Sequence, residues 1–137
     1  LPLHITSLQH LCDLLSNTKI RLLVVGGAGS LYVDPAHTVQ VMDLDNFPEA
    51  FKPLAKNMGA ALTELRTRND VLWTYLSPAA DFQADGARTG NILLGGEEYF
   101  VNEKGFSAIS YADYAIAMID EIEKADHIQK RFSVIGA

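Results

Sequence analysis

The stretch from Arg21 to Ser30, RLLVVGGAGS, constrains the fold of this chain more than any other. An apolar run that begins at Leu22 ends abruptly in four small residues and a hydroxyl. A run without interleaved polar residues is typical of a strand buried on both faces, as in a parallel sheet. The small residues after it let another backbone or a ligand approach closely. Because ligands bind at the carboxyl ends of strands in open α/β sheets, we expect the working site here.

The same glycines resemble the start of a dinucleotide fingerprint, G-x-G-x-x-G, but the context argues against it. Tyr32 stands where the third glycine belongs, and Asp34-Pro35 follows where a helix should open. Residues 39–43 look like a second strand ending in an acid, yet residues 30–38 are too few for a crossover between parallel strands. A glycine-ended central strand is the better interpretation.

A second strand is expected at residues 71–76, which are rich in β-formers. It ends in Ser77-Pro78-Ala79-Ala80, again small residues at a carboxyl end. Two neighbouring strands that end in this way would build one shared crevice.

Three helices are predicted around these strands. Leu8, Leu11, Cys12 and Leu15 share one helical face, after a cap at Thr6 or Ser7. A second helix extends to about residue 66, capped by Asp45 or Asn46, with a bend or restart at Pro53. A capping box at residues 110–113 opens the third.

The segments between these elements are also predicted. We expect an irregular segment at 30–46, which is either functional or simply solvated, and a loop at 81–90. A hairpin is expected at 91–94 and 99–101, and a last strand at 132–135.

Composition narrows the function classes. The 137 residues suit one domain, and the net charge of −6 argues against a nucleic-acid partner because no basic stripe exists. No apolar run approaches the roughly 18 residues of a membrane span, and no signal peptide is visible. The single Cys12 cannot form an internal disulfide, which favours a cytoplasmic setting. We expect Cys12 to be a core residue rather than a reactive one.

Several common chemistries find no support. The four histidines are scattered without metal-ligand spacing, so no metal site is predicted. The serine of Gly27-Ala28-Gly29-Ser30-Leu31 stands one place late for a nucleophile elbow. No phosphate loop of the G-x-x-x-x-G-K type occurs. Ser30 is the most suggestive hydroxyl, because it leaves a strand at a glycine bend; it could hydrogen-bond a substrate carbonyl or cap a turn.

Four segments in this order carry a resemblance to a known family: RLLVVGGAGSL at 21–31, WTYLSPA at 73–79, RTG at 88–90 and ISYADYA at 109–115. Together they resemble the atypical short-chain dehydrogenase/reductase superfamily. Within it the chain is most similar to the bacterial NAD(P)-binding epimerase/dehydratase-like proteins, which are related to NADH-flavin-reductase-like and NmrA-like proteins.

This resemblance implies a Rossmann-like α/β fold with a parallel sheet, in which the strand ending at Gly26 would be the fifth and the strand at 73–76 the sixth. The family's phosphate loop, G-x-x-G-x-x-G, lies before both and is absent from this sequence, which also lacks an opening methionine. We therefore expect residues 1–137 to form a single domain, a fragment equivalent to the carboxyl-terminal part of a longer NAD(P)-binding domain.

The resemblance also implies site residues and a cofactor, NAD or NADP. Ser30 matches the family's catalytic serine. The crevice that receives the nicotinamide would be formed by Gly26, Gly27, Ala28 and Gly29, and by Ser77, Pro78 and Ala79. The family's catalytic tyrosine and lysine would fall near Phe51 and Ala55, so its proton relay does not carry over.

The function implied is that of an NAD(P)-dependent oxidoreductase or epimerase-like protein with an unidentified small-molecule substrate. The missing tyrosine favours an alternative, a non-catalytic NAD(P)-binding sensor like the NmrA-like proteins. A second alternative is an interaction or assembly fragment. Half a sheet exposes a strand edge, so such a fragment would form a homodimer, swap segments or be unstable alone.

Overall fold

The computed structural model describes residues 2–137, with side chains described from residue 5 onward. Its order of elements follows the alternation expected of an α/β protein, with two short 3-10 helices, η1 and η2, before the second α-helix. The elements are α1 (Pro2–Leu15), β1 (Arg21–Val25), η1 (Val41–Asp43), η2 (Glu49–Phe51), α2 (Lys52–Arg66), β2 (Leu72–Ser77), β3 (Asp81–Gln83), β4 (Ile92–Gly95), β5 (Ala108–Ser110), α3 (Tyr111–Lys124) and β6 (Lys130–Gly136).

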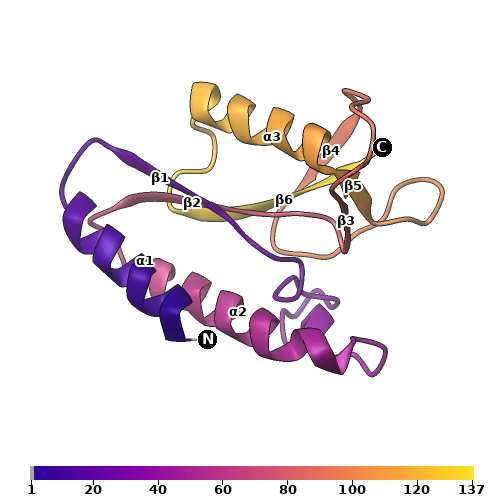
Figure 1. Ribbon diagram of the computed structural model, residues 1–137, viewed down its shortest axis with the longest axis horizontal. Coiled ribbons are helices and arrows are strands. Elements are labelled where there is room, and N and C mark those ends of the chain that lie inside the picture. The colour runs from indigo at the N-terminus through magenta and orange to yellow at the C-terminus, as the bar shows by residue number, and fades with distance from the viewer. Residues whose placement is uncertain (1) are drawn as a thin grey trace.

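A four-stranded sheet organises the molecule, in the order β1-β2-β6-β4. The β1–β2 and β2–β6 pairs are parallel, whereas β4 runs antiparallel to β6. Helices α1 and α2 lie on one side of the sheet and α3 on the other (Figure 1). The short strands β3 and β5 form a separate parallel pair. The expected Rossmann-like α/β architecture is therefore confirmed.

Each face of the sheet has its own apolar core. On one face, Leu8 and Cys12 of α1 and Leu62 of α2 pack with Trp73 and Tyr75 of β2. On the other, α3 covers a second cluster, formed by Leu76, Ala79, Ile109, Tyr114, Ala117, Phe132, Val134 and Ile135. Strand β2 contributes to both clusters, which explains its continuous apolar sequence. Cys12 is only 2% exposed, and burial raises the pKa of its thiol, so the prediction of a core cysteine is confirmed.

Strand β1 is confirmed as a strand, but the prediction that it is central and buried on both faces is wrong. In the described chain it lies at an edge of the sheet, with β2 as its only neighbour. Its residues are only partly buried, and Val25 is 56% exposed. An apolar run of this kind is compatible with a central strand and with an edge strand, because residue types alone do not determine how many strands lie beside it.

The helix boundaries differ from the predictions where side-chain caps were expected. Helix α1 begins at Pro2, so Thr6 and Ser7 lie within it and do not cap it. Helix α2 restarts after η2 with Pro53 in its first turn, as predicted, because proline tolerates that position. Its N-cap residue is Phe51 and makes no side-chain cap, so the expected cap at Asp45 or Asn46 is wrong.

The predicted hairpin is also wrong. Strand β4 pairs with β6 rather than with residues 99–101. The loop predicted for 81–90 contains β3, whose partner β5 lies some way along the chain. These pairings join segments distant in sequence, so local turn signals could not reveal them. Segment 30–46 is irregular as predicted, apart from η1.

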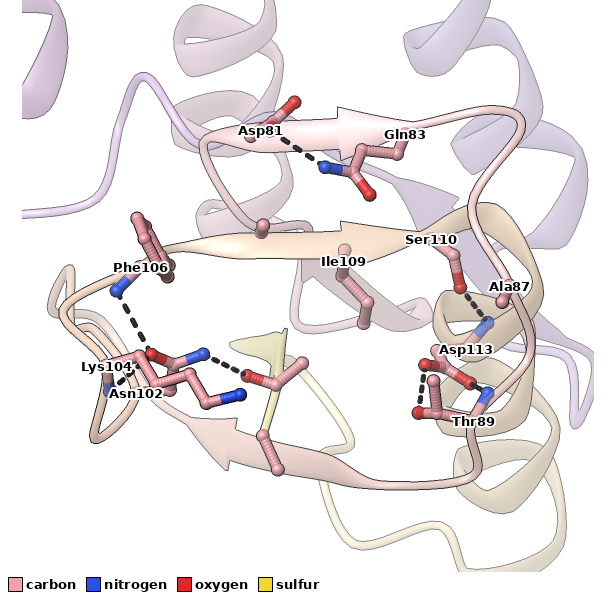
Figure 2. A pocket seen from close by; sticks show the side chains of 13 residues that line it. Asp81, Gln83, Ala87, Thr89, Asn102, Lys104, Phe106, Ile109, Ser110 and Asp113 are labelled. Carbon is pink, nitrogen blue, oxygen red and sulfur yellow. Dashed lines mark hydrogen bonds between the residues drawn. The ribbon is translucent and has the colours of Figure 1, made fainter.

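The amino-terminal end of α3 forms half of the expected capping box. Ser110 Oγ accepts a hydrogen bond from the Asp113 N–H at 3.0 Å. The Asp113 carboxylate does not return to Ser110; it accepts from the Thr89 N–H at 2.9 Å and from the Thr89 hydroxyl at 2.7 Å (Figure 2). It also accepts from the Gly90 N–H at 3.0 Å. Burial alone would raise the pKa of Asp113, but these donors outweigh it and lower the pKa. Asp113 therefore ties the 88–90 segment to α3.

A buried ion cluster lies near the amino ends of the strands. The Glu121 side chain is 2% exposed, and its carboxylate lies 2.7 Å from Arg21 Nη2 and 2.7 Å from His127 Nδ1. Arg21 also donates to Thr74 Oγ1 at 2.8 Å. Burial alone would raise the pKa of Glu121, but the hydrogen bonds from His127 and Arg21 outweigh it, so the pKa lies below its ordinary value. This cluster joins α3 to β1 and β2.

None of the helices in the described range has the length and apolar character needed to cross a membrane.

Glu121→Gln should lower the free energy of unfolding by about 3 kcal/mol at neutral pH, because it leaves the Arg21 guanidinium without its buried counter-ion. Urea unfolding followed by circular dichroism measures this. Glu123→Gln, an exposed change on the same helix, is the matched control and should cost little. Equal effects of the two variants would contradict a structural role for the cluster.

The Glu121 contribution should also depend on pH. The folded-state pKa is lowered, so the stabilisation is complete above the unfolded value of about 4.3 and is lost as the pH falls through the folded value. The difference in stability between wild type and Glu121→Gln should therefore shrink in acid. A difference that stays constant from neutral pH to about pH 3 would show that ionisation of Glu121 is not its source.

Candidate functional site

A cleft of about 740 Å³ lies at the carboxyl ends of β1 and β2. The glycine turn, residues 26–29, forms one wall, and Pro78, Ala79 and Ala80 follow β2 beside it. The parallel register pairs Val25 with Leu76, so the segments that follow β1 and β2 leave the sheet at the same level. The prediction that two strands ending in small residues share one crevice is confirmed. We call this cavity the glycine cleft.

The glycine turn fits only because it lacks side chains at two points. A Cβ atom on Gly26 would lie 2.1 Å from Tyr75 Cε1, and one on Gly29 would lie 2.9 Å from the Ala55 Cβ. The Gly26 N–H donates to Leu76 O at 2.9 Å, which extends the β1–β2 pairing by one step. The turn therefore packs directly on β2 and α2.

The other walls of the glycine cleft are apolar. Segment 41–58 contributes Val41, Leu44, Phe47, Phe51, Leu54 and Met58. Phe82 and Tyr99 line the cavity from elsewhere in the chain. Among the described lining residues no carboxylate, lysine, arginine or histidine occurs, and the polar side chains are those of Asn46 and Tyr99. The cleft therefore suits a neutral, largely apolar group.

Two predicted site residues lie behind the cleft wall rather than along it. Ser30 is 4% exposed and Ser77 is fully buried. Both hydroxyl oxygens accept from Arg131 Nη1, at 2.9 Å for Ser30 and 3.2 Å for Ser77. Gly26, Gly27, Ala28, Gly29, Pro78 and Ala79 do line the cleft. The catalytic role of Ser30 and the cofactor contacts of the other residues stay predictions.

Arg131 is the residue that the sequence reasoning missed. It occupies β6, its side chain is 1% exposed, and its Nε lies 2.8 Å from Glu97 Oε1. Glu97 also pairs with Arg66, at 2.7 Å. Burial alone would raise the pKa of Glu97, but the two arginines outweigh it and lower the pKa. The only sequence signal was an arginine directly before the predicted strand at 132–135.

A second cavity of about 520 Å³ lies beside β3 and β5 (Figure 2). Its polar groups are largely engaged with one another. Asn102 Oδ1 accepts from the N–H groups of Lys104 and Phe106, and Gln83 donates to Asp81. Asp113 is held by Thr89 and Gly90, as described above. The glycine cleft is the better candidate, since its two polar side chains, those of Asn46 and Tyr99, make no hydrogen bond within the described chain.

Nothing in the described side chains suggests a metal centre, because residues 5–137 contain no group of three or more histidine, cysteine, aspartate or glutamate residues placed to hold an ion.

Gly26→Ala should destabilise the protein by about 3 kcal/mol, because its methyl group would overlap the Tyr75 ring. Gly27→Ala is the matched control, since its Cβ would approach only the flexible Met58 side chain, at 3.3 Å. Thermal unfolding of both variants measures the effect. A similar loss of stability in both would show that the Gly26–Tyr75 contact is not the constraint.

Comparison with known proteins supports a relationship over nearly the whole chain. No protein-family model matches it. The uncharacterised protein YwnB of Bacillus subtilis (strain 168) is 48% identical over 135 residues, which cover 98% of this chain and 63% of YwnB. The chain therefore spans less than two thirds of the length of this relative.

Solved structures agree. A protein of Streptococcus pneumoniae TIGR4, provisionally described as an NADH-flavin reductase, matches with a TM-score of 0.97 and 52% identity, over 99% of this chain and 65% of that protein. A provisionally described epimerase of Bacteroides thetaiotaomicron matches with a TM-score of 0.78 and 41% identity, over 85% of this chain and 53% of that protein. In sequence and in fold, the chain is thus similar to a protein described as an NADH-flavin reductase and to one described as an epimerase, and it spans less than two thirds of the length of each.

Proposed function

We propose that this chain forms the nicotinamide and acceptor end of an NAD(P)-dependent reductase that acts on a small, neutral, ring-shaped substrate. The observation that carries the proposal is the glycine cleft, an apolar cavity at the carboxyl ends of two parallel strands, the usual ligand position in open α/β sheets. The similarity to a protein described as an NADH-flavin reductase and to one described as an epimerase supports it.

The lining residues fit one end of a dinucleotide. The glycine turn allows a flat ring to approach the backbone, and Pro78 and Ala79 offer small apolar contacts beside it. In the described chain no arginine or lysine lines the cleft to meet a pyrophosphate. The fit therefore covers the nicotinamide and not the phosphates. When bound, a nicotinamide supplies or accepts a hydride.

Backbone donors of the glycine turn can orient a ligand oxygen. Gly26 and Gly27 donate their N–H groups to Leu76 O and to the Tyr75 hydroxyl. Within residues 2–137, the N–H groups of Ala28 and Gly29 donate to no other group, and both residues line the cleft. A carbonyl or carboxamide oxygen placed there would gain two donors in an apolar setting, where such bonds are strong.

The cleft offers little for general acid–base catalysis. Phe51 and Ala55, which stand near the family's tyrosine and lysine positions, both line it. Acceptors such as quinones and flavins need no dedicated side-chain acid, because the proton that follows hydride transfer can come from water. Substrates whose chemistry demands a positioned proton donor are a poorer fit.

The same observation favours one alternative, a protein that binds NAD(P) without turning it over. In such a protein Phe51 and Ala55 would line a site that binds the dinucleotide but lacks the side chains for catalysis. The bound ligand would change the exposure of two apolar side chains near the cleft, Phe51, which is 60% exposed, and Leu54, which is 47% exposed.

We also propose a cytoplasmic setting, supported by the single buried cysteine.

The test is NADH and NADPH oxidation in the presence of 1,4-naphthoquinone or FMN, followed by absorbance, with YwnB assayed in parallel as a protein of full length. We expect turnover by YwnB with the neutral quinone, and weaker activity or ring binding alone by the 137-residue chain. Saturable NAD(P)H binding without turnover in both would support the sensor. Neither binding nor turnover in either protein would refute both functions.

A further inference from the structure

A charged side chain lies buried directly behind the glycine cleft. Arg131 occupies β6 opposite Tyr75 of β2, and only 1% of its side chain is exposed. A buried guanidinium is costly unless its charge is paired and its donors are used. Glu97 supplies the counter-charge, at 2.8 Å from Nε.

The remaining donors of Arg131 reach both strand ends that form the cleft. Nη1 donates to Ser30 Oγ at 2.9 Å and to Ser77 Oγ at 3.2 Å, and Nη2 donates to Ser30 O at 3.0 Å. Ser30 directly follows the glycine turn, and Ser77 directly precedes Pro78. One rigid, planar group thus joins the two walls from behind.

Apart from Arg131, the glycine turn is held by backbone hydrogen bonds and by packing against Tyr75 and Ala55. Glycines have wide conformational freedom, and the free N–H groups of Ala28 and Gly29 make no internal bond in the described chain. The carbonyl groups of both residues accept bonds, from the N–H groups of Leu31 and Met42. The hydrogen bonds from Arg131 to Ser30 therefore hold the turn at the residue where it leaves the cleft.

We propose that Arg131 is a positioning residue: by holding Ser30 and Ser77 it fixes the glycine turn so that the Ala28 and Gly29 N–H groups can receive an oxygen atom of the ligand. This deepens the proposed function and rests on it. It also assigns the two serine hydroxyls to the support of the cleft, since their oxygens are turned toward the guanidinium.

The first test concerns the turn itself and needs no ligand. Amide hydrogen exchange, read by NMR on the 137-residue chain, reports the Gly26, Leu31 and Met42 N–H groups, which bond to Leu76, Ala28 and Gly29. Arg131→Met should speed their exchange about tenfold while the amides of β2 stay protected. Arg66→Met, which removes only the more exposed partner of Glu97, is the matched control and should leave the turn unchanged.

A folded Arg131→Met protein with unchanged exchange at these three amides would overturn the proposal. If that variant does not fold, Ser30→Ala decides instead, because it removes one acceptor and leaves the guanidinium paired with Glu97. Faster exchange confined to the turn supports the proposal, and unchanged exchange overturns it.

The second test concerns the ligand, with NADH and 1,4-naphthoquinone as probes and the equivalent substitution made in YwnB, at the residue aligned with Arg131. We expect KM for the quinone to rise about tenfold with a smaller change in kcat, and lysine at this position to restore only part of the loss, because it lacks the planar fork. An unchanged KM in a folded variant would overturn the proposal. If wild-type YwnB shows no turnover, the proposed function fails while the exchange test still decides the role of Arg131.

Discussion

The parallel pairing of β1 with β2 is the constraint on which the rest of the structure depends. It brings Val25 level with Leu76, so that the glycine turn and the Ser77–Ala80 stretch leave the sheet side by side. Parallel strands need a covering connection, and α2 supplies it. Its residues Ala55 and Met58 then complete the cleft. Fold and site are therefore consequences of one register.

Two buried charge clusters hold this arrangement at opposite ends of the strands. Near the amino ends, Glu121 pairs with Arg21 and His127. At the carboxyl ends of β1 and β2, Arg131 pairs with Glu97 and donates hydrogen bonds to Ser30 and Ser77. Each cluster joins segments that are far apart in the sequence. Apolar packing alone tolerates small sliding between elements, whereas a buried ion with fixed partners does not. The site thus owes its shape to polar contacts outside it.

The described lining of the glycine cleft contains no carboxylate, cationic side chain or histidine, and this limits the reactions that the cleft can catalyse. A cavity lined by Phe47, Phe51 and Met58, with backbone donors at one wall, can hold and orient a ring but does little proton chemistry. That combination agrees with reduction of an acceptor that takes its proton from water. It agrees less well with an epimerase, because inverting a carbon centre calls for a side chain that takes up or delivers a proton.

Much of the fold and part of the site could be predicted from the sequence. The runs at Leu22 and Leu72, the restart at Pro53 and the Ser110 cap carry their structure locally, through residue type and spacing. So does the shared crevice, because small residues at two strand ends leave room wherever the strands are parallel. The resemblance to the dehydrogenase/reductase superfamily rested on the same local segments.

What only the tertiary structure decided concerns contacts between distant residues. The sequence by itself determined that β1 is a strand that ends in a glycine turn, since apolar runs and glycines act through local backbone preference. The pairing of β4 with β6 and the burial of Ser30 and Ser77 against Arg131 depend on which segments meet. A local sequence pattern cannot predict these long-range contacts, because they depend on the packing of the whole chain.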